Sequence, residues 1–197
     1  MKLSRDFYTR DDVCQISKDL LGKYLFTRFN AKITAGIITE TEAYAGITDR
    51  ASHAYGNRRT KRTEVMYHEG GVAYVYLCYG MHHLFNIVTN KKDIPHAVLI
   101  RGIKPVEGVD TMNKRRTKKT STYDRIISGP GIVTQALGIK TIHTRIDLCG
   151  DIIWLEDRGI KILPGNIIVS PRIGVAYAKE DALLPYRFQF VDILKTG

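Results

Sequence analysis

Acidic and aromatic side chains gather near the middle of this sequence, and their types could do chemistry on a flat substrate. They are Glu40, Glu42, Tyr44, His53, Tyr74, Tyr76 and Tyr79. Flat rings suit a pocket for a nucleobase, because every nucleobase offers π-faces for stacking, and a nearby carboxylate can activate water at the sugar carbon. Each tyrosine alone is better explained as part of the core of a sheet. The group as a whole favours a base-binding pocket.

Nucleotide-cofactor and zinc mechanisms find no support in the sequence. It contains no GxGxxG after a strand, no GxxxxGK[ST], no HExxH and no HxE followed by PCxxC. His82 and His83 are adjacent and would point in opposite directions on a strand, which is a poor arrangement for chelation. Cys14, Cys78 and Cys149 lie far apart without a CxxC pair, which favours reduced thiols. We therefore expect no metal and no cofactor.

The charge of the chain is unusual. Its 197 residues include 30 Lys and Arg against 20 Asp and Glu, a formal net charge of +10. This balance points to a polyanionic partner, with nucleic acid ahead of an anionic membrane surface. Basic residues cluster at 58–62 and 114–119, and each cluster is either a solvated loop or a phosphate-binding segment. The electrostatic candidates for phosphate contacts are Arg58, Arg59, Arg116 and Lys118.

Length and hydropathy indicate one soluble domain. No apolar run approaches the roughly 20 residues that a membrane span needs, and the first residues lack an apolar signal region. A composition of 44% hydrophobic and 25% charged residues suits a single globular domain over residues 1–197. We expect a cytoplasmic, non-secreted protein with no membrane partner.

Two strand-like runs must position the acids. They cover residues 24–29 and 33–44 and are separated by a short turn. Alternate side chains of a strand share a face, so Glu40, Glu42 and Tyr44 should project to the same side. Two acids and an aromatic ring on one face are unusual for a core.

A hairpin should follow, with strands over 72–77 and 84–89 and Tyr79 near its tip. The other expected elements are a helix over 13–20, a long basic loop over 45–64 with a short helix near Met66, strands over 97–103, 152–155, 160–163, 167–169 and 187–191, and helices over 105–112 and 130–137. Together they predict an α+β fold: one compact domain with a curved, mostly antiparallel sheet and peripheral helices.

Several short segments, taken in order, carry a resemblance to a known family. They are 38–44 (ITETEAY), His53, 74–81 (YVYLCYGM), Asn86, 99–101 (LIR), 128–131 (SGPG) and 171–175 (PRIGV). The sequence resembles the alkyladenine-type 3-methyladenine DNA glycosylases, or methylpurine DNA glycosylases, over nearly its whole length. The resemblance implies a compact mixed domain without metal or cofactor, with a fold similar to the C-terminal domain of methionyl-tRNA formyltransferase.

The resemblance also implies roles for particular residues. Glu42 matches the acid that positions and deprotonates the attacking water, and Arg101 matches the arginine that helps to hold that water and the carboxylate. Tyr44 on one side, with His53 and Tyr76 on the other, match the residues that sandwich a flipped base. Because the reaction passes through an oxocarbenium-like sugar, Glu42 has to be ionised to stabilise it and act as general base.

Three further residues match by the same resemblance. Tyr79 corresponds to the tyrosine that wedges into the minor groove where the base has left the stack, and a hairpin tip suits a wedge. Asn86 corresponds to the side chain that crowds the 2-amino group of guanine. Ile173 belongs to the base pocket.

The implied activity is that of a monofunctional DNA glycosylase without lyase activity. Its substrate is double-stranded DNA that contains damaged purines, 3-methyladenine and 7-methylguanine first, with hypoxanthine and ethenoadenine as further candidates. The product is an abasic site for base-excision repair. A monomer suffices for sliding and flipping, and a bacterial protein would act at the nucleoid. The ranking of lesions and the identity of a general acid stay open.

Two other functions stay open at this point. A non-catalytic nucleic-acid-binding module would explain the positive charge, but not the combination of Glu42 with Arg101. An inverting glycoside hydrolase would use Glu40 and Glu42, whose Cβ atoms would stand roughly 6.6 Å apart on one strand. Those carboxylates would lie side by side rather than on opposite faces of a sugar, which disfavours this function.

Overall fold

The structure is a computed structural model and describes residues 1–116 and 126–190. Its strands are β1 Tyr24–Phe29, β2 Lys32–Tyr44, β3 Val72–Cys78, β4 His82–Thr89, β5 His96–Glu107, β6 Ile127–Ser128, β7 Ile153–Glu156, β8 Ile167–Ser170 and β9 Arg187–Phe190. They form one sheet with the order β3-β4-β5-β2-β1-β7, to which β6 adds at β5, β9 at β2 and β8 at β9. All strand pairs within the described residues are antiparallel.

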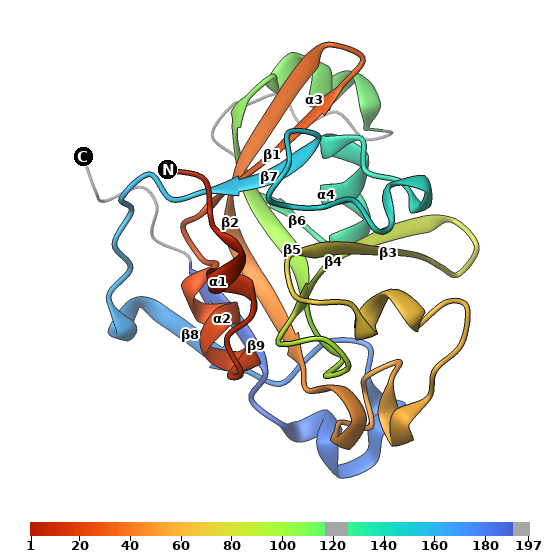
Figure 1. Cartoon of the computed structure of the whole chain (residues 1–197). Helices are drawn as coiled ribbons and strands as arrows, with labels where there is room; N and C mark the ends of the chain where they lie inside the picture. Colours follow the sequence, from red (N-terminus) through yellow and green to blue (C-terminus); the bar gives the residue numbers. More distant parts are fainter. Residues whose placement is uncertain (117–125, 191–197) are drawn as a thin grey trace.

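The helices are short and lie at the periphery of the sheet (Figure 1). The α-helices are α1 Arg5–Tyr8, α2 Val13–Asp19, α3 Val109–Arg115 and α4 Pro130–Leu137, and 3-10 turns cover Gly46–Thr48, Tyr55–Asn57, Glu64–Tyr67, Thr141–His143, Pro164–Asn166 and Ala176–Leu183. The side chain of Asp12 caps α2 by accepting the N–H of Gln15. The expected α+β domain with a curved antiparallel sheet is confirmed.

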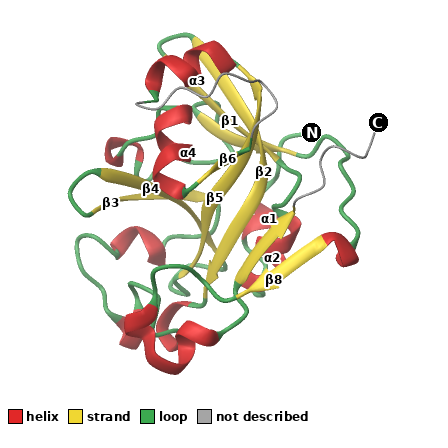
Figure 2. Cartoon of the chain, turned by 180° about the vertical axis from the view of Figure 1, so that it is seen from behind, coloured by secondary structure: helices red, strands yellow, loops and turns green. Residues whose placement is uncertain are grey.

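The two faces of the sheet pack against different parts of the chain. On one face, α2 and α4 cover the main hydrophobic core, to which Ile87 of β4 and Ile100 of β5 belong; Figure 2 shows α4 lying close to β4 and β5. On the other face, the 45–68 loop covers a smaller cluster that contains Tyr74. The 45–68 loop and the 171–186 segment lie side by side below the β3–β4 hairpin (Figure 1).

The predicted helix over 105–112 is wrong in its first part. Strand β5 continues to Glu107, and the helix covers only Val109–Arg115. Strand β2 is long enough to pair with this extension, and Pro105 stands opposite Gly36 beside a register shift. Proline is tolerated in a sheet at such an irregularity, where a regular ladder hydrogen bond is not required.

The predicted strand over 160–163 is also wrong, because these residues form neither helix nor strand. Their alternating apolar pattern is explained by packing over Gly22, since a Cβ at that glycine would lie 3.1 Å from Ile162 Cδ1 and 3.2 Å from Ile160 Cγ2. The other expected elements are present with small shifts of their ends, and residue 191 of the predicted strand over 187–191 lies outside the described residues. No helix in residues 1–116 and 126–190 has the length and apolar character needed to cross a lipid bilayer.

Candidate functional site

A cavity of about 390 Å³ opens on the face of the sheet that the 45–68 loop covers. This volume is in the range of small-molecule sites. Its lining contains most of the residues that the sequence predicted for a base pocket: Tyr44, His53, Tyr76, Tyr79, Asn86, Arg101 and Ile173. The lining also contains Arg62 and Tyr177, which sequence reasoning did not single out. Among the predicted pocket and catalytic residues, Glu42 alone does not line this cavity.

Two neighbouring register shifts in the pairing of β2 with β5 direct Arg101 and the acids of β2 toward this site. Thr39 and Arg101 have no partner in the strand register, so each strand carries one extra residue at this point. An extra residue changes the face to which the following side chains point. Ile38 and Ile103 therefore face the main core, whereas Arg101 and the acids of β2 face the cavity side. Gly102 allows the close approach, since a Cβ there would lie 2.7 Å from Thr39 Oγ1.

Glu42 lies fully buried directly behind the cavity wall. Its Oε1 accepts the backbone N–H of Ile173 at 2.8 Å, and its Oε2 accepts the hydroxyl of Tyr44 at 2.9 Å. Arg101 Nη1 donates to Oε2 at 3.4 Å. All three donor residues line the cavity. The expectation that Glu42 and Tyr44 share one face of β2 is thus confirmed.

Burial raises the pKa of Glu42 above its usual value, because a charge is poorly solvated there. The charge of Arg101 acts in the opposite direction, and so do the hydrogen bonds from the Ile173 N–H and the Tyr44 hydroxyl. Burial also raises the pKa of Tyr44, so its hydroxyl keeps the proton that it donates. The neighbouring charge of Glu40 adds to the rise, whereas every hydrogen bond to the Glu42 carboxyl comes from a donor and favours its ionised form.

Arg101 lies between the two acids of β2. Its Nε donates to Glu40 Oε1 at 2.9 Å and lies 3.4 Å from Glu42 Oε1. The same Glu40 oxygen accepts Arg187 Nε of β9 at 2.7 Å. Glu40 is therefore committed to two guanidinium groups, which argues against its use as one carboxylate of a glycoside hydrolase pair. Sequence reasoning identified Glu40 as a candidate acid but missed its contacts with both arginines.

Three aromatic side chains form a connected wall of the cavity. His53 and Tyr76 have ring centroids 4.7 Å apart and an interplanar angle of 77°. A planar base that stacks on one of these rings therefore meets the edge of the other. Tyr74 supports both, because its hydroxyl lies 2.8 Å from His53 Nδ1 and its ring centroid 5.5 Å from that of Tyr76.

His53 is neutral in this environment. Burial, followed by the positive charges of Arg62 and Arg58, lowers the pKa of His53 to about 4. Arg62 Nη2 lies 3.2 Å from His53 Nε2 and can only donate, so Nε2 is the acceptor and the ring proton is on Nδ1, facing the Tyr74 hydroxyl. The guanidinium of Arg62 also lies 4.9 Å from the centre of the Tyr76 ring.

Tyr79 is at the tip of the β3–β4 hairpin, as the sequence predicts. Its side chain is 87% exposed although it lines the mouth of the cavity. Its backbone is in the left-handed region with φ of 50°, which is costly for a bulky residue and is often found at functional sites. The hairpin therefore presents an aromatic ring to solvent at the edge of the cavity.

Asn86 and Ile173 both line the cavity. Asn86 is buried on β4, and its Nδ2 donates to the carbonyls of Tyr74 and Leu84 at 3.2 and 3.4 Å. These bonds fix the amide. Ile173 is about half exposed and follows Arg172 in the PRIGV segment.

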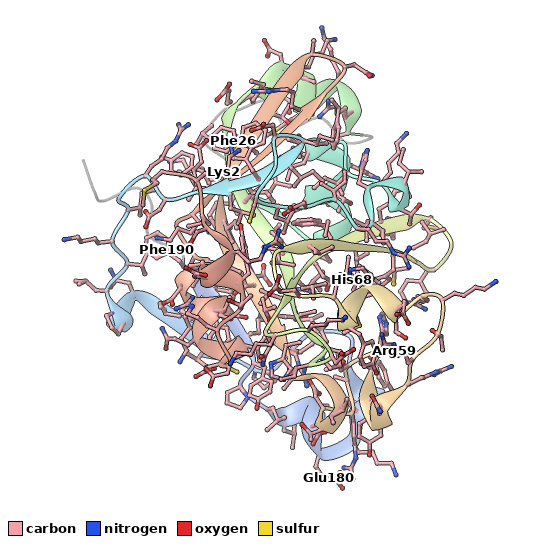
Figure 3. The ribbon with its side chains drawn as sticks, in the orientation of Figure 1. Lys2, Phe26, Arg59, His68, Glu180 and Phe190 are labelled. Carbon is pink, nitrogen blue, oxygen red and sulfur yellow. The ribbon has the colours of Figure 1, made fainter. Side chains whose placement is uncertain are left out.

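Of the four basic residues predicted to contact phosphates, those that the structure describes differ in their ion pairs and in their distance from the cavities. Arg59 pairs with Glu64 and Asp93 at 2.9 Å each, so its charge is already balanced; Figure 3 shows it at the outer edge of the molecule. In contrast, the Arg58 side chain forms no ion pair within residues 1–116 and 126–190, and it lines a second cavity of about 490 Å³ beside the first. Arg116 follows α3, whose residues line neither cavity. Lys118 is outside the described residues.

The second cavity is basic and shares residues with the first. Arg50 and Arg62 line it together with Arg58, and His53 and Tyr177 border both cavities. Arg50 pairs with Glu180, which lies at the lower end of the molecule in Figure 3. In the part of the chain that the structure describes, no three His, Cys, Asp or Glu side chains converge in an arrangement that could hold a metal ion.

Comparison with known proteins gives a consistent result. The model of the family described as "Methylpurine-DNA glycosylase (MPG)" matches residues 6–192. A "Putative 3-methyladenine DNA glycosylase" of Chlamydia felis (strain Fe/C-56) is 46% identical over 186 residues, which cover 94% of each chain. A protein of the same name from Clostridium novyi (strain NT) is 43% identical over 197 residues, covering 97% of this chain and 96% of its own. The similarity spans every residue of both cavities.

Proposed function

Because the chain belongs to the methylpurine-DNA glycosylase family, we propose that it flips a damaged purine out of double-stranded DNA and excises it with a water activated by Glu42. The family membership makes the protein a DNA repair enzyme that hydrolyses N-glycosidic bonds. The particular lesions and the roles of individual residues are part of the proposal. A non-catalytic binding module is the weaker alternative, because the chain is similar to glycosylases over nearly its whole length.

The observation that carries the mechanism is the position of Arg101 and Tyr44 between the cavity and the buried Glu42 carboxylate. A base that enters against Tyr44 displaces the Tyr44 hydroxyl from Glu42 Oε2, and a water takes its place beside Arg101. This water attacks C1′ and gives its proton to Glu42. The electrons of the N-glycosidic bond leave with the purine, and the carboxylate stabilises the positive charge on the sugar.

We further propose that the cavity selects damaged purines by stacking and by shape. Tyr44 forms one wall, while the Tyr76 ring and the edge of His53 form the other. Asn86, held by its two backbone contacts, limits the space beside the base and disfavours the 2-amino group of guanine. Cationic 3-methyladenine and 7-methylguanine are good leaving groups and come first. For 7-methylguanine, which keeps the 2-amino group, this lability has to outweigh the crowding by Asn86. Hypoxanthine and ethenoadenine are further candidates.

The DNA duplex lies across the hairpin tip and the basic cavity in this proposal. Tyr79 fills the gap that the flipped base leaves in the stack, which offsets part of the unstacking cost of a few kcal/mol. Arg58 and Arg62 are close enough to the base pocket to contact the backbone beside the flipped nucleotide. The whole chain acts as one glycosylase domain and as a monomer. We propose a cytoplasmic location, at the nucleoid if the protein is bacterial.

The enzyme is monofunctional in this proposal. Cleavage of the backbone through a Schiff base requires an amine nucleophile such as lysine. Among the described residues that line the base cavity there is no lysine. This supports water as the nucleophile and an abasic site as the product.

The decisive experiment is the release of free bases from methylated duplex DNA, separated by chromatography, with the Glu42→Gln protein in parallel at the same salt concentration. Release of 3-methyladenine by the wild type but not by Glu42→Gln supports the reaction and the role of Glu42. If both proteins bind DNA and neither releases a base, a binding module becomes the better explanation.

A further inference from the structure

Arg172 and Asp49 form an ion pair that is almost completely enclosed. Their side chains are 0% and 1% exposed, and the guanidinium makes two contacts with the carboxylate, at 2.5 and 2.8 Å. Arg172 also donates to the carbonyls of Ala43 at 2.9 Å and Asp181 at 3.1 Å. One guanidinium thus joins the end of β2, the loop that follows it and the 171–183 segment.

Asp49 is held equally firmly. Its Oδ2 accepts the backbone N–H of Ala45 at 3.0 Å, and its Oδ1 accepts that of Ala51 at 2.9 Å. These bonds close the turn that directly follows Tyr44. The Arg172 guanidinium also lies 4.9 Å from the centre of the Tyr44 ring. The pair therefore holds the path of the chain next to Tyr44, which lines the cavity.

The residue after Arg172 contacts the candidate catalytic acid. The N–H of Ile173 donates to Glu42 Oε1 at 2.8 Å, while Arg172 binds the carbonyl of the next residue of β2, Ala43. Two consecutive residues of the 171–175 segment thus bind two consecutive residues of β2. The contact of Ile173 with Glu42 therefore lies directly beside the contact of Arg172 with Ala43.

A buried ion pair is weak evidence for a role in stability. Replacing such a pair with well-packed apolar residues is often neutral or stabilising, because desolvation of the charges cancels most of their attraction. The geometry of the Arg172–Asp49 pair points instead to a role in orientation. A planar guanidinium fixes both the angle and the distance at which its partners bind.

We propose that the Arg172–Asp49 pair is the positioning element of the site, which holds the Ile173 N–H on Glu42 Oε1 and leaves Oε2 as the oxygen that receives the water. The inference rests on the proposed function for its catalytic meaning. Its structural part is that Arg172, through Ile173, affects the pKa of Glu42. This effect can be measured without any reaction. Neither Arg172 nor Asp49 touches the substrate, so both are positioning residues.

The charged and titratable groups near Glu42 come from three strands of the sheet and from the 171–183 segment. Arg101 approaches from β5, Glu40 and Tyr44 belong to β2, and Arg187 of β9 stands opposite Glu42 in the register and binds Glu40. The 171–175 segment contributes the Ile173 N–H. Tyr177 and Arg172 itself also interact electrostatically with Glu42. A substitution that keeps the positive charge at position 172 leaves all these charges present, so a changed titration of Glu42 then reports on the Ile173 contact.

The test compares Arg172→Lys with the wild type. Lysine keeps the charge but cannot bind Asp49 and Ala43 with a planar fork. Glutamate labelled with ¹³C at its side-chain carboxyl gives the titration of Glu42 by NMR, with Glu42→Gln used to assign its signal. We expect the pKa of Glu42 to rise in Arg172→Lys, because the ionised carboxylate loses a donor. We also expect single-turnover excision to fall about tenfold or more, with lesion affinity within about threefold of the wild type.

Arg5→Lys is the matched control. Arg5 also binds a carboxylate and a backbone carbonyl, those of Asp147 and Gly70, at 2.7 Å each, but it does not line the cavity. It should lower thermal stability without changing the Glu42 titration. If Arg172→Lys does not fold, Asp49→Asn tests the same pair, because it removes the charge while keeping the shape of the side chain.

The outcomes separate the inference from the proposed function. An unchanged Glu42 titration together with unchanged excision in Arg172→Lys overturns the positioning role. The role is also overturned if Arg172→Lys loses excision only in parallel with stability and lesion affinity, with the Glu42 titration unchanged as in Arg5→Lys. If the wild type releases no base from methylated DNA, the proposed function fails, while the NMR titration still decides whether Arg172 controls Glu42.

Discussion

Glu40 Oε1 accepts a hydrogen bond from Arg101 Nε at 2.9 Å, so the first acid of the ETEAY segment holds the guanidinium that faces the second acid. Arg187 binds the same oxygen at 2.7 Å. The two acids that alternate on β2 therefore have different surroundings. Glu42 lies directly behind the cavity wall, whereas Glu40 forms ion pairs with both Arg101 and Arg187.

Replacing Glu40 with glutamine should lower excision by about tenfold or more, because the Arg101 guanidinium loses a charge-assisted partner and its position in front of Glu42. Thermal stability should also fall, since two partly buried arginines then share a neutral amide. Single-turnover kinetics on lesion DNA and thermal melting measure the two effects. Wild-type excision by Glu40→Gln would show that Arg101 is held by other contacts.

Replacing Glu42 with glutamine should abolish most excision, by about 100-fold or more, because general-base catalysis and electrostatic stabilisation of the sugar are lost together. Lesion binding should persist, since Glu42 does not line the cavity. Gel-shift titration and single-turnover base release on the same oligonucleotide separate the effects. Glu69→Gln, an exposed acid outside the site, is the control.

Replacing Tyr79 with alanine should weaken base flipping by about tenfold, because the unstacked step then has no ring to fill it. The fluorescence change of an ethenoadenine probe in duplex DNA reports flipping directly. Ile142→Ala, at a side chain that is 80% exposed away from the cavity, controls for the loss of surface apolar area. An unchanged fluorescence response would remove Tyr79 from this role.

Two neighbouring arginines should behave differently when DNA affinity is measured against salt concentration. Arg58→Ala should reduce the slope of log affinity against log salt by about one, as expected for one lost phosphate contact. Arg59→Ala should change the slope less and stability more, since its charge is paired with Glu64 and Asp93. Equal slopes for the two variants would contradict the assignment of the basic cavity to the DNA backbone.

The neutral state of His53 predicts a pH dependence of folding. Its pKa is about 4 in the folded protein, below its usual value near 6.5, so the unfolded state binds more protons between these two values. The contribution of His53 to stability is therefore present above about pH 6.5 and is lost as the pH falls toward 4. Thermal melting at pH 7 and pH 5 should show a smaller loss for His53→Gln than for the wild type.

The sequence by itself determined the local arrangements. Alternation along a strand places Glu42 and Tyr44 on one face of β2, and turn residues between two β-rich runs place Tyr79 at a hairpin tip. The antiparallel, curved sheet followed from the number and spacing of short strands. These features depend on neighbours in sequence, and the periodicity of a strand is enough to predict them.

Only the tertiary structure decided which distant groups meet. It turned Arg101 toward Glu42 through an extra residue in each of β2 and β5, which strand periodicity cannot reveal. It paired Arg172 with Asp49, 123 residues away, and neutralised Arg59 while leaving Arg58 without an ion-pair partner in the described part of the chain. Such contacts depend on strand register and on how loops cross the sheet, because those set the distances between side chains that the sequence places far apart.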